Sequence, residues 1–148
     1  TDNHVFSWLK TNRKIIKIIM RICVDLDGVI CTLKKKGETY ADVQVKPGVQ
    51  ETLKKYREDG HYIIIQTARH MKTCESNLGL VNKRVTKITL DWLEEHEIEY
   101  DEIYFGKPWC DIYIDDNAYR FEGWDKIQNP TEDLPLSNEK RKKIKERK

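Results

Sequence analysis

The stretch that decides the fold is RICVDLDGV, residues 21–29. It begins with a short apolar run that Asp25 interrupts, and it reaches the dipeptide Asp27-Gly28 two residues later. A short apolar run that ends in Asp-Gly is typical of a buried strand that leads into a tight turn. We therefore predict a strand over residues 22–26 with two carboxylates at its carboxyl end.

Downstream of this strand, the sequence predicts a helix and then a second strand. The helix lies within VKPGVQETLKKYREDG, because Pro47 suits a first helical turn and Gly60 suits a stop. Residues 62–65 are rich in β-branched side chains, which favour a strand. A strand, a helix and a strand in this order predict a right-handed crossover and a parallel sheet.

The rest of the chain continues the same alternation. Val85, Ile88 and Trp92 recur at helical spacing and predict a second helix after a polar loop over residues 71–80. Residues 103–105 and 112–114 are two further short apolar runs, which we interpret as the third and fourth strands. The predicted fold class is α/β, a doubly wound, Rossmann-like parallel sheet flanked by helices.

The length of 148 residues predicts one compact domain. We expect this domain over residues 21–128, preceded by an N-terminal extension over residues 1–20. Residues 129–148 contain two prolines and end in a lysine-rich run, so we predict a tail that is a frayed helix or disordered.

Composition narrows the class of protein further. The formal net charge is only +2, which disfavours a nucleic-acid binder, and we interpret the basic tail as a solvated charge run. The four cysteines are spaced too widely for a paired CxxC zinc site, so we expect reduced thiols. No run of about 20 apolar residues is present to span a membrane. We therefore expect a cytoplasmic protein that does not engage membranes.

Polar residues follow each of the four predicted strands. The carboxyl ends of parallel strands form the edge where open α/β sheets place their sites, so these residues should lie together. They are Asp25 and Asp27, Thr67 with Arg69, Lys107, and Asp115 with Asp116.

These residue types suit phosphate chemistry beside a magnesium ion. Carboxylates gathered at one edge repel one another unless a cation lies among them, and Asp25 and Asp115 are the expected ligands. Charge on a bound phosphoryl group needs donors, which the Thr67 hydroxyl, backbone amides near Ala68 and the Lys107 ammonium can supply. The predicted cofactor is therefore Mg²⁺.

The second carboxylate has a different predicted role. Asp27 lies two residues beyond Asp25, hence on the same side of an extended strand, where it can act as a general acid and base. Gly28 then lets the backbone turn closely around the phosphate.

Each residue also has a structural interpretation. Asp27-Gly28 alone is typical of a turn, Thr67 of a strand end, and Asp115-Asp116 of a helix N-cap. Four ordered clusters favour catalysis, although for Asp116 capping and metal binding stay open. Arg69 is a candidate for substrate binding or a surface residue, and we leave His70 out of the catalytic set.

The motifs RICVDLDGV, IIIQTAR, GKP and YIDD resemble, in order, the four motifs of haloacid dehalogenase-like (HAD) phosphatases. This resemblance covers residues 21–121. The chain also resembles small phosphatases of bacterial capsule and surface-polysaccharide biosynthesis. It implies that Asp25 forms an aspartyl-phosphate, that Asp27 is the acid and base, and that the threonine and lysine hold phosphate. The implied metal ligands are Asp25, Asp27, Asp115 and Asp116.

The sequence leaves no room for a substantial cap domain after the first motif. Only about 20 residues separate Ile30 from Val49, too few for an independently folded domain. An open site is compatible with a homo-oligomer or a large substrate. We expect residues 31–45 and 71–81 to decide the substrate.

The predicted function is a Mg²⁺-dependent phosphomonoester hydrolase that acts through an aspartyl-phosphate. Its substrate would be a small phosphorylated molecule, a sugar or polyol phosphate of capsule biosynthesis. One alternative is a nucleotide or polynucleotide 3'-phosphatase, which would use the basic tail. A non-enzymatic alternative is a phospho-acceptor signalling module, but such modules carry their acidic pair and their phosphorylated aspartate on different strands.

Overall fold

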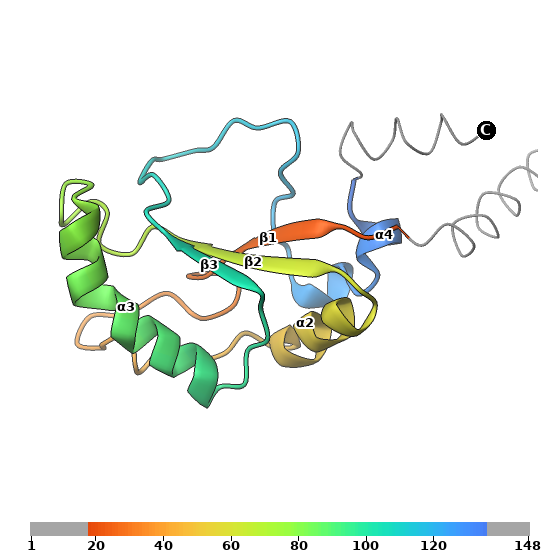
Figure 1. Cartoon of the computed structure of the whole chain (residues 1–148), viewed down its shortest axis with the longest axis horizontal. Helices are drawn as coiled ribbons and strands as arrows, with labels where there is room; N and C mark the ends of the chain where they lie inside the picture. Colours follow the sequence, from red (N-terminus) through yellow and green to blue (C-terminus); the bar gives the residue numbers. More distant parts are fainter. Residues whose placement is uncertain (1–17, 136–148) are drawn as a thin grey trace, which may run out of the picture.

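The computed structural model of the chain describes residues 18–135 (Figure 1). The predicted N-terminal extension lies outside the described residues up to position 17. The predicted lysine-rich tail lies outside them from position 136 onward.

Three of the four predicted strands form a parallel sheet. They are β1 (Arg21–Asp25), β2 (Tyr62–Thr67) and β3 (Glu102–Phe105), in the order β1-β2-β3. Val24 lies opposite Ile65 in the register, so the first and second strands end at the same edge. The α/β class and the parallel sheet are thereby confirmed.

Both predicted helices are present. The first, α2 (Val49–Glu58), begins directly after Gly48, whose φ of 82° is in the left-handed region that glycine tolerates. The second, α3 (Leu78–Glu95), begins inside the stretch that we expected to be a loop. The reason is Asn77, whose side chain accepts a hydrogen bond from the amide of Leu80 at 3.2 Å and caps the helix.

The two helices cover the same face of the sheet (Figure 1). The core between them consists of Val24, Ile63 and Ile65 from the strands, Leu53 and Tyr56 from α2, and Trp92 and Leu93 from α3. On the opposite face, Cys23 and Tyr104 are exposed. Right-handed crossovers that step in one direction across a sheet place their helices on one face. The doubly wound arrangement is therefore not formed within residues 18–135.

The prediction of a fourth strand over residues 112–114 is wrong for this structure. The segment after β3 runs as a long irregular loop (Figure 1), in which the side chain of Ile114 is 97% exposed. Within this loop the Tyr113 hydroxyl donates a hydrogen bond to the Pro108 carbonyl. An apolar run needs a neighbouring strand to satisfy its backbone groups, and none of the described strands pairs with this one. The β1 strand accordingly lies at an edge of the sheet.

The chain after this loop returns to the core and fixes the turn that follows β1. The short helix η1 (Trp124–Lys126) places the Trp124 indole so that it donates to the Val29 carbonyl at 2.8 Å. It is followed by α4 (Pro130–Asp133), and between them the Ile127 carbonyl accepts from the buried Tyr56 hydroxyl. These contacts hold the loop that carries Asp27. Within residues 18–135, no helix has both the length and the apolar character needed to cross a membrane.

Candidate active site

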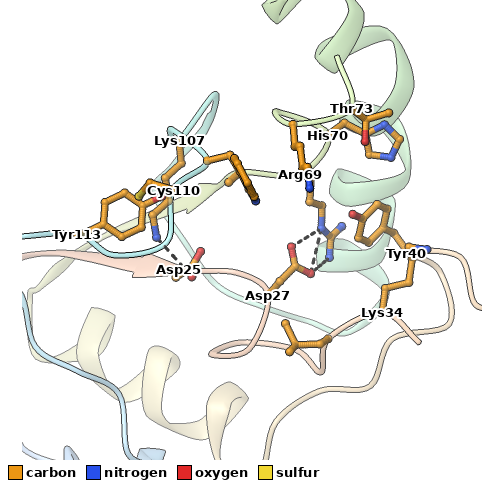
Figure 2. A pocket seen from close by; sticks show the side chains of 14 residues that line it. Asp25, Asp27, Lys34, Tyr40, Arg69, His70, Thr73, Lys107, Cys110 and Tyr113 are labelled. Carbon is orange, nitrogen blue, oxygen red and sulfur yellow. Dashed lines mark hydrogen bonds and ion pairs between the residues drawn. The ribbon is translucent and has the colours of Figure 1, made fainter. Parts of the chain in front are cut away.

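Asp25 is the last residue of β1, and its carboxylate faces the Lys107 ammonium at 3.4 Å (Figure 2). The other carboxylate oxygen accepts from the Leu26 amide at 2.9 Å. Lys107 is held in place because its own amide donates to the carbonyl of Thr67, the last residue of β2, at 3.1 Å. The sheet edge thus brings together two residues that lie far apart in the sequence.

The electrostatics of Asp25 reflect a balance between burial and charge. Burial raises the pKa of the Asp25 carboxyl above its usual value, while the Lys107 ammonium and the Leu26 amide oppose that rise. The negative charge of Asp27 adds to it. An Asp25 carboxylate is therefore more basic than a solvated aspartate, which suits a nucleophile.

Asp27 is held by a two-pronged ion pair with Arg69 (Figure 2). Nη2 of the guanidinium lies 2.9 Å from one carboxylate oxygen, and Nε lies 2.9 Å from the other. The remaining donor, Nη1, reaches the Thr89 hydroxyl of α3 at 3.0 Å, and the Tyr40 ring lies 4.0 Å from the guanidinium carbon. Because the Arg69 side chain is only 1% exposed, this pair fixes the orientation of the Asp27 carboxylate.

The predicted role of Arg69 in substrate binding stays a prediction. Arg69 lies at the wall of the cavity, but its guanidinium donors point to Asp27 and Thr89. The arrangement favours a role in which Arg69 orients the Asp27 carboxylate.

A thiol that sequence reasoning treated only as a reduced cysteine completes the surroundings of Asp27. The Sγ atom of Cys31 lies 3.4 Å from an Asp27 carboxylate oxygen and 3.6 Å from the Arg69 guanidinium. Burial, together with the charge of Asp27, raises the pKa of the Cys31 thiol to about 12. The thiol is therefore protonated at neutral pH and can donate to the carboxylate. All four cysteines are free in the structure.

The predicted phosphate-binding residues differ in their access to the cavity. Lys107 and Ala68 line it. Thr67 is buried beneath it, where the hydroxyl accepts from the Arg69 amide at 3.1 Å. The Gly28 amide already donates to the Cys31 carbonyl at 2.8 Å, in a turn where the φ of Gly28 is 89°. Of the predicted phosphate-binding residues, Lys107 thus places a charged donor at the cavity wall.

The structure does not bring Asp115 and Asp116 to this edge. Both are exposed on the loop after β3, and Asp115 accepts a local hydrogen bond from the Asn117 amide at 3.0 Å. Among residues 18–135, no three His, Cys, Asp or Glu side chains are grouped as a metal site would require. Since Asp27 is paired with Arg69, the donors as arranged do not fit a magnesium ion.

The site opens into a cavity of about 420 Å³ above Asp25 and Asp27 (Figure 2). Its walls include several side chains that sequence reasoning did not assign to the site, namely Lys34, Tyr40, Lys72, Thr73, Cys110 and Tyr113. Four of these come from residues 31–45 and 71–81, the two stretches expected to decide the substrate. The residue types of these loops could be read from the sequence, but the path of each loop in space could not.

The fold and the cavity define a small α/β protein with a parallel sheet and paired acidic and basic side chains at its carboxyl edge. No protein-family model matches the chain, and no curated protein sequence matches it. A crystal structure of a target protein from Vibrio cholerae is similar, with a TM-score of 0.63 and 34% sequence identity. The match covers 88% of this chain and 98% of the Vibrio cholerae chain. The chain therefore belongs to the same family as that protein.

Proposed function

We propose that this protein is a phosphomonoester hydrolase of the HAD type in which Asp25 is the nucleophile. The observation that carries the proposal is the contact of Asp25 with Lys107 on the floor of an open cavity. A second carboxylate, Asp27, lines the same cavity and is held in a fixed orientation by Arg69. The order of these residues along the chain is that of the HAD motifs.

The reaction follows from these positions in two steps. An Asp25 oxygen bonds to phosphorus as the bond to the leaving oxygen breaks. The leaving oxygen takes a proton from Asp27, which must first take up that proton from solvent and loosen its ion pair with Arg69. Asp27, now a carboxylate, then takes a proton from water, whose oxygen attacks phosphorus. The bond between phosphorus and Asp25 breaks and phosphate leaves. Throughout, the Lys107 ammonium offsets negative charge on the phosphoryl oxygens.

Magnesium dependence is part of the proposal, although no step above is routed through the metal. When bound, a magnesium ion would neutralise charge on the phosphoryl group. Its binding requires Asp115 to approach Asp25. Pairing of residues 112–114 with the free edge of β1 would bury Ile114 and carry Asp115 to the carboxyl edge of the sheet.

We propose a small phosphorylated molecule as the substrate, a sugar or polyol phosphate of capsule biosynthesis. A cavity of about 420 Å³ lies in the range of sites for small molecules, which supports this size of substrate. The link to capsule biosynthesis rests on the resemblance. The four free cysteines fit a reducing compartment such as the cytoplasm.

The test is phosphate release with and without magnesium from sugar phosphates, polyol phosphates, nucleotides and 3'-phosphorylated oligonucleotides. We expect release from small phosphomonoesters by the native protein, and a loss of at least about a thousandfold in Asp25→Asn. Asp59→Asn, at an exposed position after α2, is the matched control and should retain activity. Equal activity in native protein and Asp25→Asn would overturn the proposal, as would silence of the native protein on the whole panel.

A further inference from the structure

The cavity contains more positive than negative charge. Of the lysine and arginine side chains that line it, two form the ion pairs with Asp25 and Asp27 described above. The other two, Lys34 and Lys72, make no ion pair with a carboxylate anywhere in the part of the chain that the structure describes. The cavity therefore carries positive charge that its own carboxylates do not neutralise.

Aromatic rings and a carbonyl hold these two lysines without neutralising them. The Lys34 ammonium lies 5.7 Å from the centre of the Tyr40 ring and donates to the Glu38 carbonyl at 3.4 Å. The Lys72 ammonium lies 4.6 Å from the centre of the Trp109 ring. Such contacts orient an ammonium group and leave its charge available to an anion.

His70 adds an unsatisfied polar atom at the end of the cavity where Lys34 lies. Figure 2 shows His70, Thr73, Tyr40 and Lys34 together, on the side away from Lys107. The His70 ring lies 5.9 Å from the Tyr40 ring, and its Nδ1 atom is buried with no hydrogen-bond partner among the described residues. Burial and the nearby charges of Arg84, Lys34 and Arg69 lower the pKa of His70. No carboxylate is among these influences, so the surroundings of the ring are electropositive.

The backbone of this segment is also unusual. His70 has a φ of 59°, in the left-handed region that residues other than glycine seldom adopt. Strain of this kind persists where surrounding structure enforces it, and it concentrates at ligand sites. In this conformation the half-buried His70 ring lies against the Tyr40 ring.

We infer that the end of the cavity lined by Lys34 and His70 binds a second anionic group of the substrate, with Lys72 as a further unpaired cation of the same cavity. The substrate class is then a small phosphomonoester whose alcohol portion also carries a carboxylate or a second phosphoryl group. This inference rests on the proposed function, because it assigns the reacting phosphoryl group to the Asp25 and Lys107 end.

The experiment compares substrates that differ only in the second anion. Glucitol 6-phosphate is paired with 6-phosphogluconate, and fructose 6-phosphate with fructose 1,6-bisphosphate. We expect kcat/KM to favour the member with the second anion by about tenfold, equivalent to about 1.4 kcal/mol. In the double variant Lys34→Gln/Lys72→Gln the preference should fall to below about threefold, because the two unpaired cations of the cavity are removed. The control Lys35→Gln/Lys36→Gln removes two exposed lysines of the same loop that do not line the cavity, and should keep the preference.

Equal kcat/KM within both pairs, or an unchanged preference in Lys34→Gln/Lys72→Gln, overturns the inference and leaves the phosphatase proposal intact. A stronger preference for a 3'-phosphorylated oligonucleotide over every small substrate also overturns it, because the cavity would then serve a polymer. If the native protein hydrolyses none of these compounds, the proposed function fails. Calorimetric titration with 6-phosphogluconate and glucitol 6-phosphate then still decides the inference, which requires tighter binding of 6-phosphogluconate.

Discussion

Two acidic pairs in this chain look alike in the sequence and differ in the structure. Asp25 and Asp27 belong to one short apolar stretch, and Asp115 and Asp116 follow another. In the first pair each carboxylate faces a cation from a distant part of the chain, at 3.4 Å and 2.9 Å. In the second pair both residues are exposed, and Asp115 accepts only a local backbone hydrogen bond. The chemistry of a carboxylate therefore depends on what the fold brings to it.

Packing explains the difference between the two pairs. The loop that carries Asp27 is fixed by Leu26 and Ile30, which are fully buried, and by the hydrogen bond from Trp124 to Val29. The loop of the second pair contributes no buried residue between positions 109 and 120. A segment with few buried apolar contacts has little free energy holding it in one conformation.

The largest expected effect comes from Asp27→Asn, which tests whether the first pair is catalytic. An amide cannot donate and recover the proton, so we expect phosphate release to slow by roughly 10²- to 10⁴-fold. Acid quench after reaction with a substrate that is radiolabelled at phosphorus should trap the aspartyl-phosphate as label on the native protein or on Asp27→Asn. Asp25→Asn should carry no label. Undiminished turnover in Asp27→Asn would contradict the assigned role.

The next largest effect is on stability, and it compares a buried ion pair with an exposed one. Arg69→Met leaves the Asp27 carboxylate, whose side chain is 24% exposed, without its partner. We expect the free energy of unfolding to fall by about 3 kcal/mol, measured by urea denaturation. The control is Arg21→Met, because the pair of Arg21 with Glu102 is 65% and 35% exposed and should contribute less than about 1 kcal/mol.

A double variant separates the ion pair from general packing in that experiment. Asp27→Asn/Arg69→Met removes both charges, so its loss should be smaller than the sum of the two single losses. Additive losses would mean that Arg69 stabilises the protein through Tyr40 and Thr89 rather than through Asp27.

The same contrast shows how far the sequence predicts the structure. The three strands that form were predictable because each is an apolar run flanked by turn residues and packs against a helix. Residues 112–114 have the same local pattern, but a strand also needs a neighbour, which no local pattern reveals. Helix α3 began earlier than expected because Asn77 caps it.

In the candidate site, too, some contacts could be predicted from the sequence and others could not. Asp25 and Lys107 were predicted to meet, since both follow strands of one parallel sheet, and they do. The partners of Arg69 were not predicted, because Thr89 lies on a helix and Tyr40 on an irregular loop. Contacts that join a loop to a helix depend on the path of the loop, which has no periodicity to read.

The variant Asp115→Asn tests whether the exposed acidic pair contributes a metal ligand. If Asp115 joins Asp25 around a magnesium ion, the variant should need at least about tenfold more magnesium for half-maximal phosphate release. Its free energy of unfolding should change by less than about 0.5 kcal/mol, because the residue is exposed. Asp111→Asn, on the same loop, is the control. An unchanged magnesium requirement would show that this loop does not contribute a metal ligand.

The smallest expected effect is a shift in pH dependence, and it tests the contact that joins Asp25 to the end of β2. In the proposed reaction Asp25 must be ionised to attack phosphorus, and burial raises its pKa above the usual aspartate value. The acidic limb of kcat/KM should therefore lie at higher pH than a solvated aspartate would give. The Lys107 ammonium lowers the pKa of Asp25, so Lys107→Met should move that limb to still higher pH.

The substrate phosphate also titrates, but it does so equally for native protein and variant, so the difference between their midpoints reports the enzyme. Lys126→Met, whose ammonium is paired at 4.0 Å with Asp125, should leave the midpoint unchanged. A limb that stays in place or moves to lower pH in Lys107→Met would mean that the titrating group is not Asp25.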